Sequence, residues 1–345
     1  MNKKILASLT ALLVGVGLNA CGGDADAGSD TTVLRIAYQD IAFPALIEES
    51  GVLEGADFDV EWSNLTGPAA NLQAVYSDAV DLGHVGDTSL TIEQGNAKEE
   101  WTEETVPLQI VAGWRNFENP KYPPLITAVR SDSGVDEITD GKGKKWGFNF
   151  GGYNHAQFLV GLVQAGLTED DIEASQFADG ATSAAAFNSG QVDIYSGQHA
   201  AVLESLSAGE GKIILTDADT GIPALNVWTA RTSTLEDEEK VAALEEFFER
   251  MSGYWEWHDE NRDQVEAVLK TALKIDEERV DLEYELRRGA FRVFDDELIA
   301  QEQQVAQTLY DGKAIPNLPE VEIEYNPLFH EQQQAISTDE FKARK

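Results

Sequence analysis

Five short turns, each between an expected strand and an expected helix, carry the polar residues and glycines that could bind a solute. They are Gln39-Asp40, Thr66-Gly67-Pro68, Gly86-Asp87-Thr88, Gly151-Gly152-Tyr153 and Ser196-Gly197-Gln198. Turns of this kind bring the free N–H groups and partial positive charge of helix N-termini to the carboxyl edge of a sheet. Such an edge binds an anion without a formal positive charge, although a single turn can equally serve only to cap its own helix. Together the turns predict one anion-binding cleft.

The histidines near these turns could instead hold a metal ion. His84, His155 and His199 lie in or just after the turns, and Asp87 could join them as a further ligand. Their spacing matches no metal-binding motif. We therefore expect histidines that are hydrogen-bonded or that line an organic-ligand pocket, and we expect no metal and no other cofactor.

No catalytic motif is found in the sequence. It contains no Gly-x-Ser-x-Gly elbow, no Walker loop and no His-Glu-x-x-His zinc helix. We therefore expect a binding protein and not an enzyme. Two other classes remain open: a lyase on the same fold that uses His155, Asp87 or His199 as its base, and a surface adhesin without a small-molecule pocket.

Short apolar runs alternate with amphipathic stretches, which is typical of an α/β fold. In the first part of the chain we expect strands and helices at residues 34–38, 44–50, 58–62, 69–77 and 80–83. In the middle we expect them at 145–150, 153–165, 172–177 and 192–195. An acidic helical region follows at 236–273 and a further helix at 295–310. Trp255 and Trp257 lie on different faces of the acidic region, and we interpret both as packing residues.

The chain is too long for one ordinary core, so we predict two lobes. Residues 33–130 and 229–345 form the first lobe and residues 131–228 the second, so the chain crosses between the lobes twice. Segments 74–82 and 186–194 share a helix-turn-strand pattern. Two lobes of like construction would produce this pattern, although two ordinary turns could also match by chance.

The N-terminal residues have the layout of a lipoprotein signal peptide. Two lysines precede an apolar run at 5–18, and Cys21, the only cysteine, follows it. We predict a signal peptide at 1–20, a lipid on Cys21, and a flexible tether at 21–32 that holds an exported protein to the membrane of the cell envelope. The alternative is an uncleaved anchor, but the apolar run is shorter than the ~20 residues that a helical span needs.

The charge of the chain excludes one class of partner. The sequence has 62 Asp and Glu residues against 25 Lys and Arg residues, a formal net charge of −37. Nothing could neutralise a phosphate backbone, so nucleic acid is excluded. The acidic residues are spread along the chain, which indicates adaptation to a salty solvent and says nothing about the ligand.

Seven segments spread over nearly the whole mature chain form a characteristic set. They are Leu34-Arg35-Ile36-Ala37-Tyr38-Gln39, Val60-Glu61-Trp62, Thr66-Gly67-Pro68, Gly86-Asp87-Thr88, Gly143-Lys144-Lys145, Ala165-Gly166-Leu167 and the stretch 288–296. Together they resemble the solute-binding lipoproteins of ABC importers in the aliphatic sulfonate, taurine and nitrate group. The resemblance implies a type II periplasmic-binding-protein fold of two α/β lobes. It also implies a monomer that closes by a hinge on a solute and delivers it to the transmembrane subunits of an ABC permease.

The resemblance further implies which residues bind the solute, a small organic anion such as an aliphatic sulfonate or taurine. Members of this group hold the anion with backbone amides and hydroxyls. The corresponding positions in this sequence are Gln39, Gly67, Pro68, Asp87, Thr88, Gly151, Gly152 and Asn226. Trp114 lies where an aromatic wall could pack on the apolar part of the solute.

Two segments depart from the pattern of this group at the expected cleft. Gly151-Gly152-Tyr153 replaces a serine-bearing turn, and the segment from Tyr195 to His199 replaces a Trp-Asp-Pro-aromatic segment. We therefore include Tyr153, Gln198 and His199 among the expected ligand contacts. Nitrate, a carboxylate or a pyrimidine precursor remain alternative solutes.

Overall fold

The computed structural model describes residues 31–344. Residues Thr32–Lys345 form one compact unit. The predicted signal peptide, the lipidation site at Cys21 and nearly all of the tether lie outside the described residues. Within them, no helix is both long enough and apolar enough to cross a membrane.

The first lobe is built on two sheets. Strands β1 (Thr32–Tyr38) and β2 (Phe58–Asn64) pair in parallel, and a parallel bridge from Ile36 to Leu82 joins them to the second sheet. The second sheet has the order β11-β4-β10-β3, and its neighbouring strands are antiparallel. Its strands are β3 (Gly83–Gly86), β4 (Leu108–Asn116), β10 (Asn226–Arg231) and β11 (Gly289–Phe291).

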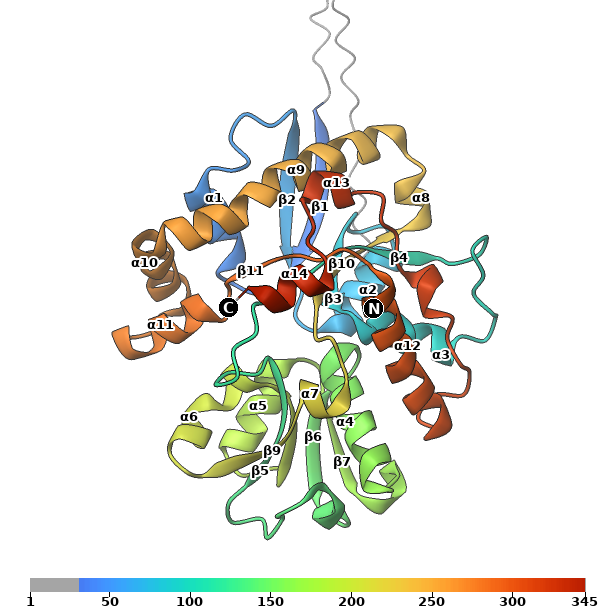
Figure 1. The fold of residues 1–345 in the computed structure, drawn as a ribbon, viewed down its shortest axis with the longest axis vertical. Coiled ribbons are helices and arrows are strands. Elements are labelled where there is room, and N and C mark those ends of the chain that lie inside the picture. The colour runs from blue at the N-terminus through green and yellow to red at the C-terminus, as the bar shows by residue number, and fades with distance from the viewer. Residues whose placement is uncertain (1–30, 345) are drawn as a thin grey trace, which may run out of the picture. The chain divides into compact units, whose positions relative to one another are not determined.

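Helices pack around these sheets (Figure 1). They are α1 (Phe43–Ser50), α2 (Pro68–Tyr76), α3 (Thr88–Asn96), α8 (Thr232–Leu235), α9 (Glu238–Glu260), α10 (Arg262–Leu273), α11 (Glu277–Glu285), α12 (Asp296–Asp311), α13 (His330–Gln333) and α14 (Thr338–Ala343). The acidic region expected to be helical at 236–273 is two helices, because the chain leaves helical geometry at Asn261.

The second lobe has one five-stranded mixed sheet with the order β7-β6-β8-β5-β9. Its strands are β5 (Leu125–Arg130), β6 (Lys145–Asn149), β7 (Glu173–Phe177), β8 (Ile194–Gln198) and β9 (Gly211–Thr216). Its helices are α4 (Gly152–Ala165), α5 (Gly180–Asn188), α6 (Leu203–Ser207) and α7 (Asp217–Thr220). The whole is the mixed α/β arrangement, with helices flanking the sheets, that the sequence predicts.

The chain passes between the lobes after β4 and again before β10. Strand β5 pairs with β8 and β9 of the second lobe, although the sequence boundary at residue 131 had assigned it to the first. Strand β10 pairs with β3 and β4 from Asn226 onward, three residues ahead of the predicted boundary at 229. Asn226 therefore lies at the point where the second crossing meets the first lobe's sheet.

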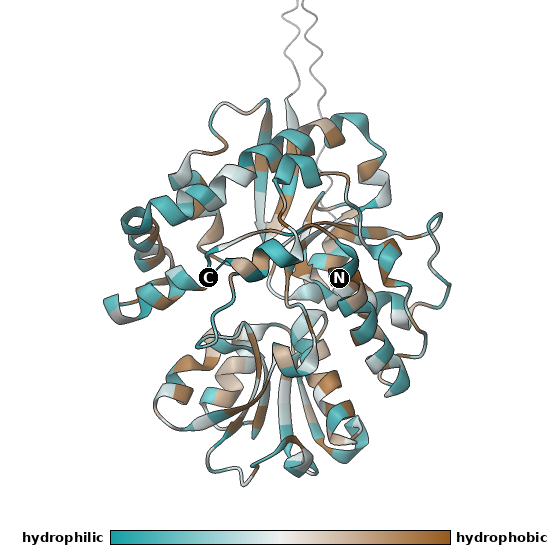
Figure 2. Cartoon of the chain, in the orientation of Figure 1, coloured by the Kyte–Doolittle hydropathy of each residue, from teal (hydrophilic) through white to brown (hydrophobic). Residues whose placement is uncertain are grey.

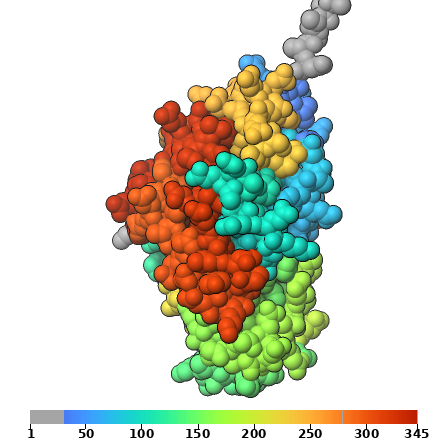
Figure 3. Space-filling view, turned by 90° about the vertical axis from the view of Figure 1, so that its right-hand side faces the viewer, coloured from blue at the N-terminus to red at the C-terminus, as the bar shows by residue number. Residues whose placement is uncertain are grey.

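Apolar side chains join the two lobes along one side. Val305 and Leu309 of α12 and Ile92 of α3 belong to the same buried cluster as Trp146 and Phe158 of the second lobe. Figure 3 shows the orange-red C-terminal segments lying against the green second lobe on this side. Figure 2 shows hydrophilic (teal) residues along much of α9 and α10, and hydrophobic (brown) residues on both helices and strands of the two lobes. The apolar contact through α12 holds the lobes together beside the cleft described below.

Candidate functional site

A cleft with a volume of about 810 Å³ lies between the lobes. Its size falls within the range of ~300–1,000 Å³ that is typical of small-molecule sites. Most of the ligand-binding positions expected from the sequence line it: Gln39, Gly67, Pro68, Trp114, Gly151, Gly152, Tyr153, Gln198 and Asn226. The structure thus brings together residues from both lobes that are far apart in the sequence.

Two helix N-termini, one from each lobe, open on this cleft. Helix α2 follows Gly67 and helix α4 follows Gly151, and neither helix has a side-chain cap among the described residues. Both glycines have left-handed backbone angles, with φ of 82° and 78°. Because no side chain of residues 31–344 accepts from the helix N–H groups that follow these two glycines, the partial positive charge there is available to a solute.

Gln39 positions the first of these turns and does not offer a free amide. Its Nε2 donates to the carbonyl oxygen of His84 at 2.6 Å, and its Oε1 accepts from the backbone N–H of Gly67 at 3.1 Å. The backbone N–H of Gln39 donates to Nδ1 of His84 at 3.1 Å. Both ends of the Gln39 side chain are thus used to fix Gly67 and His84 relative to each other.

His84 presents a neutral N–H donor to the cleft. Because its Nδ1 accepts a hydrogen bond, the ring proton is on Nε2, which lies 3.4 Å from Oδ1 of Asn226. Burial lowers the pKa of His84 to about 4, so the ring is uncharged at neutral pH. The long contact to Asn226 leaves this N–H available to a better acceptor. From the sequence we expected His84 to be hydrogen-bonded or to line an organic-ligand pocket, but we did not include it among the ligand contacts.

Tyr153, Gln198 and Asn226 form a chain of hydrogen bonds across the cleft. Nε2 of Gln198 donates to the hydroxyl of Tyr153 at 2.7 Å, and that hydroxyl donates to Oδ1 of Asn226 at 3.4 Å. Burial raises the pKa of Tyr153 to about 12, so the phenol keeps its proton. The ring that replaces the expected serine-bearing turn therefore links the second lobe to the start of β10.

Trp114 lies at the centre of an aromatic cluster in the first lobe. It is only 8% exposed, and its ring lies 5.2 Å from His84, 4.6 Å from Trp228 and 6.5 Å from Phe43, measured between centroids. Register in the sheet places Trp114 opposite Asn226, so the aromatic ring and the polar donors share one wall.

The end of α9 adds two aromatic residues that sequence reasoning did not assign to the site. Tyr254 and Trp255 line the cleft, whereas Trp257 does not. The interpretation of Trp255 as a packing residue was therefore incomplete. Only the two-residue spacing of the tryptophans hinted that they face different surroundings, and it did not say which of them faces the solute.

The arginines that line the cleft are all paired with carboxylates. Arg287 donates to Asp40 at 2.7 Å and contacts Glu283 at 2.5 Å, and Arg279 contacts Glu283 at 2.7 Å. Burial alone would raise the pKa of Asp40, but the charge and hydrogen bond of Arg287 lower it. Arg115 lies 3.6 Å from Asp217. Since these cations are already neutralised, neutral N–H donors must provide much of the attraction for an anion.

Asp87 and Thr88 do not line the cleft, which corrects the assignment made from the sequence. The Asp87 side chain is fully buried, and its Oδ1 accepts from the N–H of Thr88 at 2.8 Å, which caps α3. Its Oδ2 accepts from the N–H of Leu225 at 2.7 Å. The carboxylate thus fixes the second crossing, and its negative charge would repel an anion at the start of α3.

His199 and His155 also lie away from the cleft lining. His199 is 5% exposed and packs against Tyr122 with ring centroids 5.8 Å apart. His155 stacks on Phe148 at 5.1 Å, and its Nδ1 accepts from the N–H of Gly151. Within residues 31–344, no set of three or more His, Cys, Asp or Glu side chains is arranged to hold a metal ion.

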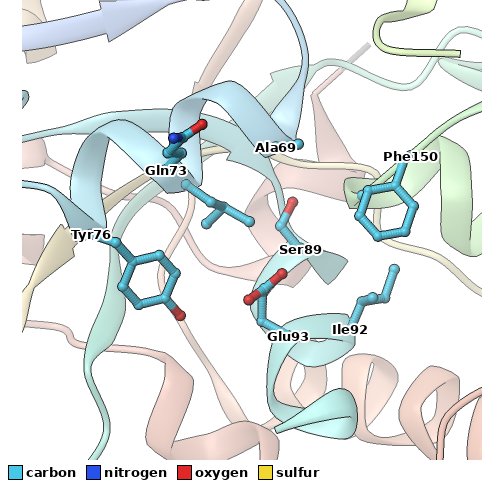
Figure 4. A pocket seen from close by; sticks show the side chains of 9 residues that line it. Ala69, Gln73, Tyr76, Ser89, Ile92, Glu93 and Phe150 are labelled. Atoms are coloured by element: carbon cyan, nitrogen blue, oxygen red, sulfur yellow. The ribbon is translucent and has the colours of Figure 1, made fainter.

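A smaller pocket of about 300 Å³ lies between α2, α3 and the turn before α4 (Figure 4). Its lining is mostly apolar, and Glu93 is the only residue in that lining with a formal charge. Burial raises the pKa of Glu93. A carboxylate at this position is unsuited to an anion, so the anion-binding groups belong to the larger cleft.

Comparison with known proteins places these features in a family. The NMT1/THI5-like family model matches residues 46–251, which is more than half of the chain. An Escherichia coli (strain K12) protein named for binding aliphatic sulfonates is 27% identical over 172 residues, 49% of this chain and 50% of that protein. The match thus spans about half the length of this curated relative.

Solved structures share the fold at lower identity. The periplasmic aliphatic sulphonate-binding protein of Escherichia coli has a TM-score of 0.66 and 21% identity, over 86% of this chain and 92% of that one. The alkanesulfonate-binding protein of Xanthomonas axonopodis pv. citri, bound to MOPS, has a TM-score of 0.70 and 19% identity, over 87% and 100%. A desulfurization enzyme, DSZB, is more distant, with a TM-score of 0.56 and 14% identity over 88% and 99%.

These neighbours establish the periplasmic-binding-protein fold, and the binding proteins among them are more similar to this chain than the enzyme is. From the extent of the family match, the chain belongs to the NMT1/THI5-like family.

Proposed function

We propose that this protein is the solute-binding component of an ABC importer and that it captures an organic sulfonate in the cleft between its lobes. The proposal rests on one observation: the N-termini of α2 from the first lobe and α4 from the second, neither with a side-chain cap among the described residues, both lie at this cleft. The resemblance to sulfonate-binding relatives supports the same solute class.

A sulfonate suits the donors present better than a carboxylate or nitrate does. Its three oxygens lie on a tetrahedral sulfur and do not share a plane with it, so it can accept at the same time from N–H groups of α2, of α4 and of His84. A carboxylate has only two oxygens, and the three oxygens of nitrate are coplanar with the nitrogen.

Binding by donors from both lobes explains how the solute would close the protein. Each lobe alone offers part of the donor set, so the full binding free energy is gained only when the lobes are together. A ligand with that preference shifts an existing open–closed equilibrium toward the closed state. No bond is made or broken, and the solute leaves chemically unchanged.

Export and anchoring belong to the same proposal. The sequence pattern around Cys21 supports a lipoprotein that acts at the outer face of a membrane as a monomer and passes its solute to permease subunits.

A binding screen on residues 24–345 tests the proposal, since the compact unit lies within this range. Ethanesulfonate and larger sulfonates are compared with acetate and nitrate by thermal shift and calorimetry. A solute at ~100 times its Kd adds ~2.7 kcal/mol of stability and raises the Tm. We expect sulfonates to do so and mass spectrometry to recover them unchanged.

His84→Ala should weaken sulfonate binding about tenfold or more, because it removes a donor from the cleft. His199→Ala is the matched control, since His199 is equally buried but lies outside the cleft lining. Its affinity should stay within about twofold of the unmodified protein. If no sulfonate raises the Tm or gives a binding signal in calorimetry, or if the solute is recovered chemically altered, the proposal is refuted.

A further inference from the structure

One part of the cleft is lined by apolar side chains that the anion-binding groups do not explain. They come from the end of α9, from the end of α10 and the residues just after it, and from the end of α11: Tyr254, Trp255, Leu273, Ile275 and Leu286. Figure 1 shows α10 and α11 at the left edge of the molecule, with α2 and α4 nearer its centre. The cleft therefore extends from the open helix N-termini toward this apolar wall.

The apolar wall carries one unsatisfied donor. Nε1 of Trp255 is buried and finds no acceptor among residues 31–344. Its ring is held in place by Tyr254 at 5.0 Å and by Phe291 at 5.7 Å, measured between centroids. A buried N–H without a partner costs stability unless a bound molecule or an ordered water supplies an acceptor.

Among the described residues, both arginines next to the wall are paired with carboxylates, so neither is free to bind a second anionic group. Arg279 and Arg287 share Glu283, and Arg287 also pairs with Asp40. Nη2 of Arg279 reaches the second lobe, where it donates to the carbonyl oxygen of Ala200 at 2.8 Å. The wall is thus an uncharged surface that is closed on one side by a contact between the lobes.

The wall also lies beyond the segment that the family model matches. That segment ends at residue 251, whereas the wall residues run from Tyr254 to Leu286. The open helix N-termini, in contrast, lie inside it. The family model therefore includes the N-termini of α2 and α4, which suit the anion. It does not include the wall residues, which suit the rest of the solute.

From these observations, and resting on the proposed sulfonate binding, we infer that the solute is a sulfonate with a bulky aromatic body and that Trp255 and Ile275 select it over short-chain sulfonates. The sulfonate occupies the N-termini of α2 and α4, while the ring system covers the wall. A cleft of about 810 Å³ has room for such a body, and a two-carbon chain would leave the wall uncovered.

Calorimetry with naphthalene-2-sulfonate and ethanesulfonate as probes tests the inference. We expect the naphthalene compound to bind at least thirtyfold more tightly to the unmodified protein. Trp255→Ala should reduce that ratio to threefold or less, mainly by weakening the larger probe. Trp257→Ala is the matched control, because Trp257 lies on the same helix outside the cleft lining, and it should keep the ratio.

Two milder variants, Trp255→Phe and Ile275→Ser, keep the test informative if Trp255→Ala does not fold, and each should lower the ratio in the same direction. Equal affinity for both probes in the unmodified protein would overturn the inference while the proposed function stands. Equal loss of both probes in the Trp255 and Ile275 variants would also overturn it. If neither probe binds the unmodified protein, the inference is overturned, and the proposed function is overturned with it when every other sulfonate of the binding screen also fails to bind.

Discussion

Helices α3 and α4 begin in similar ways, but the N-terminus of α3 is capped by a side chain and that of α4 is not. Both follow a strand and a small polar turn close to the contact between the lobes. At α3 the buried carboxylate of Asp87 takes up the first N–H and also binds Leu225. At α4, as at α2, a glycine stands at the cap, and no side chain among the described residues accepts from the helix N–H groups that follow it. We call Asp87-Thr88 the closed turn, and Gly67-Pro68 and Gly151-Gly152 the open turns.

The comparison teaches that the residue at the cap decides what a helix N-terminus can bind. An aspartate at the cap satisfies the N–H groups and neutralises the positive end of the helix. A glycine at the cap leaves both free and lets another backbone approach closely. The predictions below alter one kind of turn at a time.

The largest effect is expected from blocking an open turn. A Cβ at Gly67 would lie 2.2 Å from the carbonyl oxygen of Ala178 in the second lobe, so Gly67→Ala must push the lobes apart. Sulfonate affinity should fall on the order of a thousandfold, which corresponds to ~4 kcal/mol. Calorimetry measures the loss, and small-angle scattering should show that the solute no longer compacts the protein.

Gly55→Ala is the control for backbone strain. Gly55 also has a left-handed φ, 72° against 82° at Gly67, but a Cβ there meets nothing within 4 Å. Both variants should lose about 1–3 kcal/mol of stability from strain, and only Gly67→Ala should lose binding. If Gly67→Ala binds within threefold of the unmodified protein, the open turn does not depend on close approach of the lobes.

Removing the closed turn should affect stability and leave binding almost unchanged. Asp87→Ala deprives the buried N–H groups of Thr88 and Leu225 of their acceptor, and the free energy of unfolding should fall by about 2–3 kcal/mol. Denaturant titration measures this loss. The affinity of the folded variant for a sulfonate should stay within about threefold, and a larger change would mean that the carboxylate contributes to the site.

Asp237→Ala provides a comparison at an ordinary cap. Asp237 accepts from the N–H groups of Glu239 and Lys240 at the exposed start of α9. Its loss should cost only about 1 kcal/mol, because water can replace the carboxylate there.

A pH dependence also belongs to the closed turn. Burial raises the pKa of Asp87 to about 6, while the nearby Glu302 carboxyl, also buried, has its own pKa raised. The folded protein therefore holds the Asp87 proton at a pH where the unfolded chain has released it. The stabilisation is complete below pH ~4 and is lost as the pH rises through about 6.

Asp87→Asn isolates this contribution, because the amide does not titrate and its oxygen can still accept from Leu225. The free energy of unfolding of the unmodified protein minus that of Asp87→Asn should decrease by about 2 kcal/mol between pH 4 and pH 7. Chemical denaturation at several pH values measures the difference. A difference that does not change with pH would mean that Asp87 is ionised throughout.

Local patterns in the sequence were sufficient to predict the open turns and much of the fold. Gly67-Pro68 reads as a helix start because proline is tolerated at the first helical position, and the structure places α2 there. The same kind of pattern was misleading at Asp87-Thr88. An aspartate before a helix is a good cap for the same reason that it is a poor anion site, and the turn alone does not say which role applies.

The wall formed by Trp255 and the α10–α11 segment could not be predicted from local patterns. Residues 236–273 read as an acidic helical region, and the position of the wall residues after it depends on pairing between β11 and β4. That pairing joins Gly289 to Asn116, far apart in the sequence. Side chains brought to a site by such long-range pairing leave no signal in periodicity or spacing.

The close contact between Trp114 and Trp228 gives this protein an optical reporter of its own. Indole rings whose centroids lie 4.6 Å apart share their electronic excitation, and one of the two rings lines the cleft. A solute that packs on Trp114 changes the field around the pair. Binding should therefore change the near-ultraviolet circular dichroism of the unlabelled chain. The rate at which this signal returns after dilution gives the lifetime of the bound state without a dye.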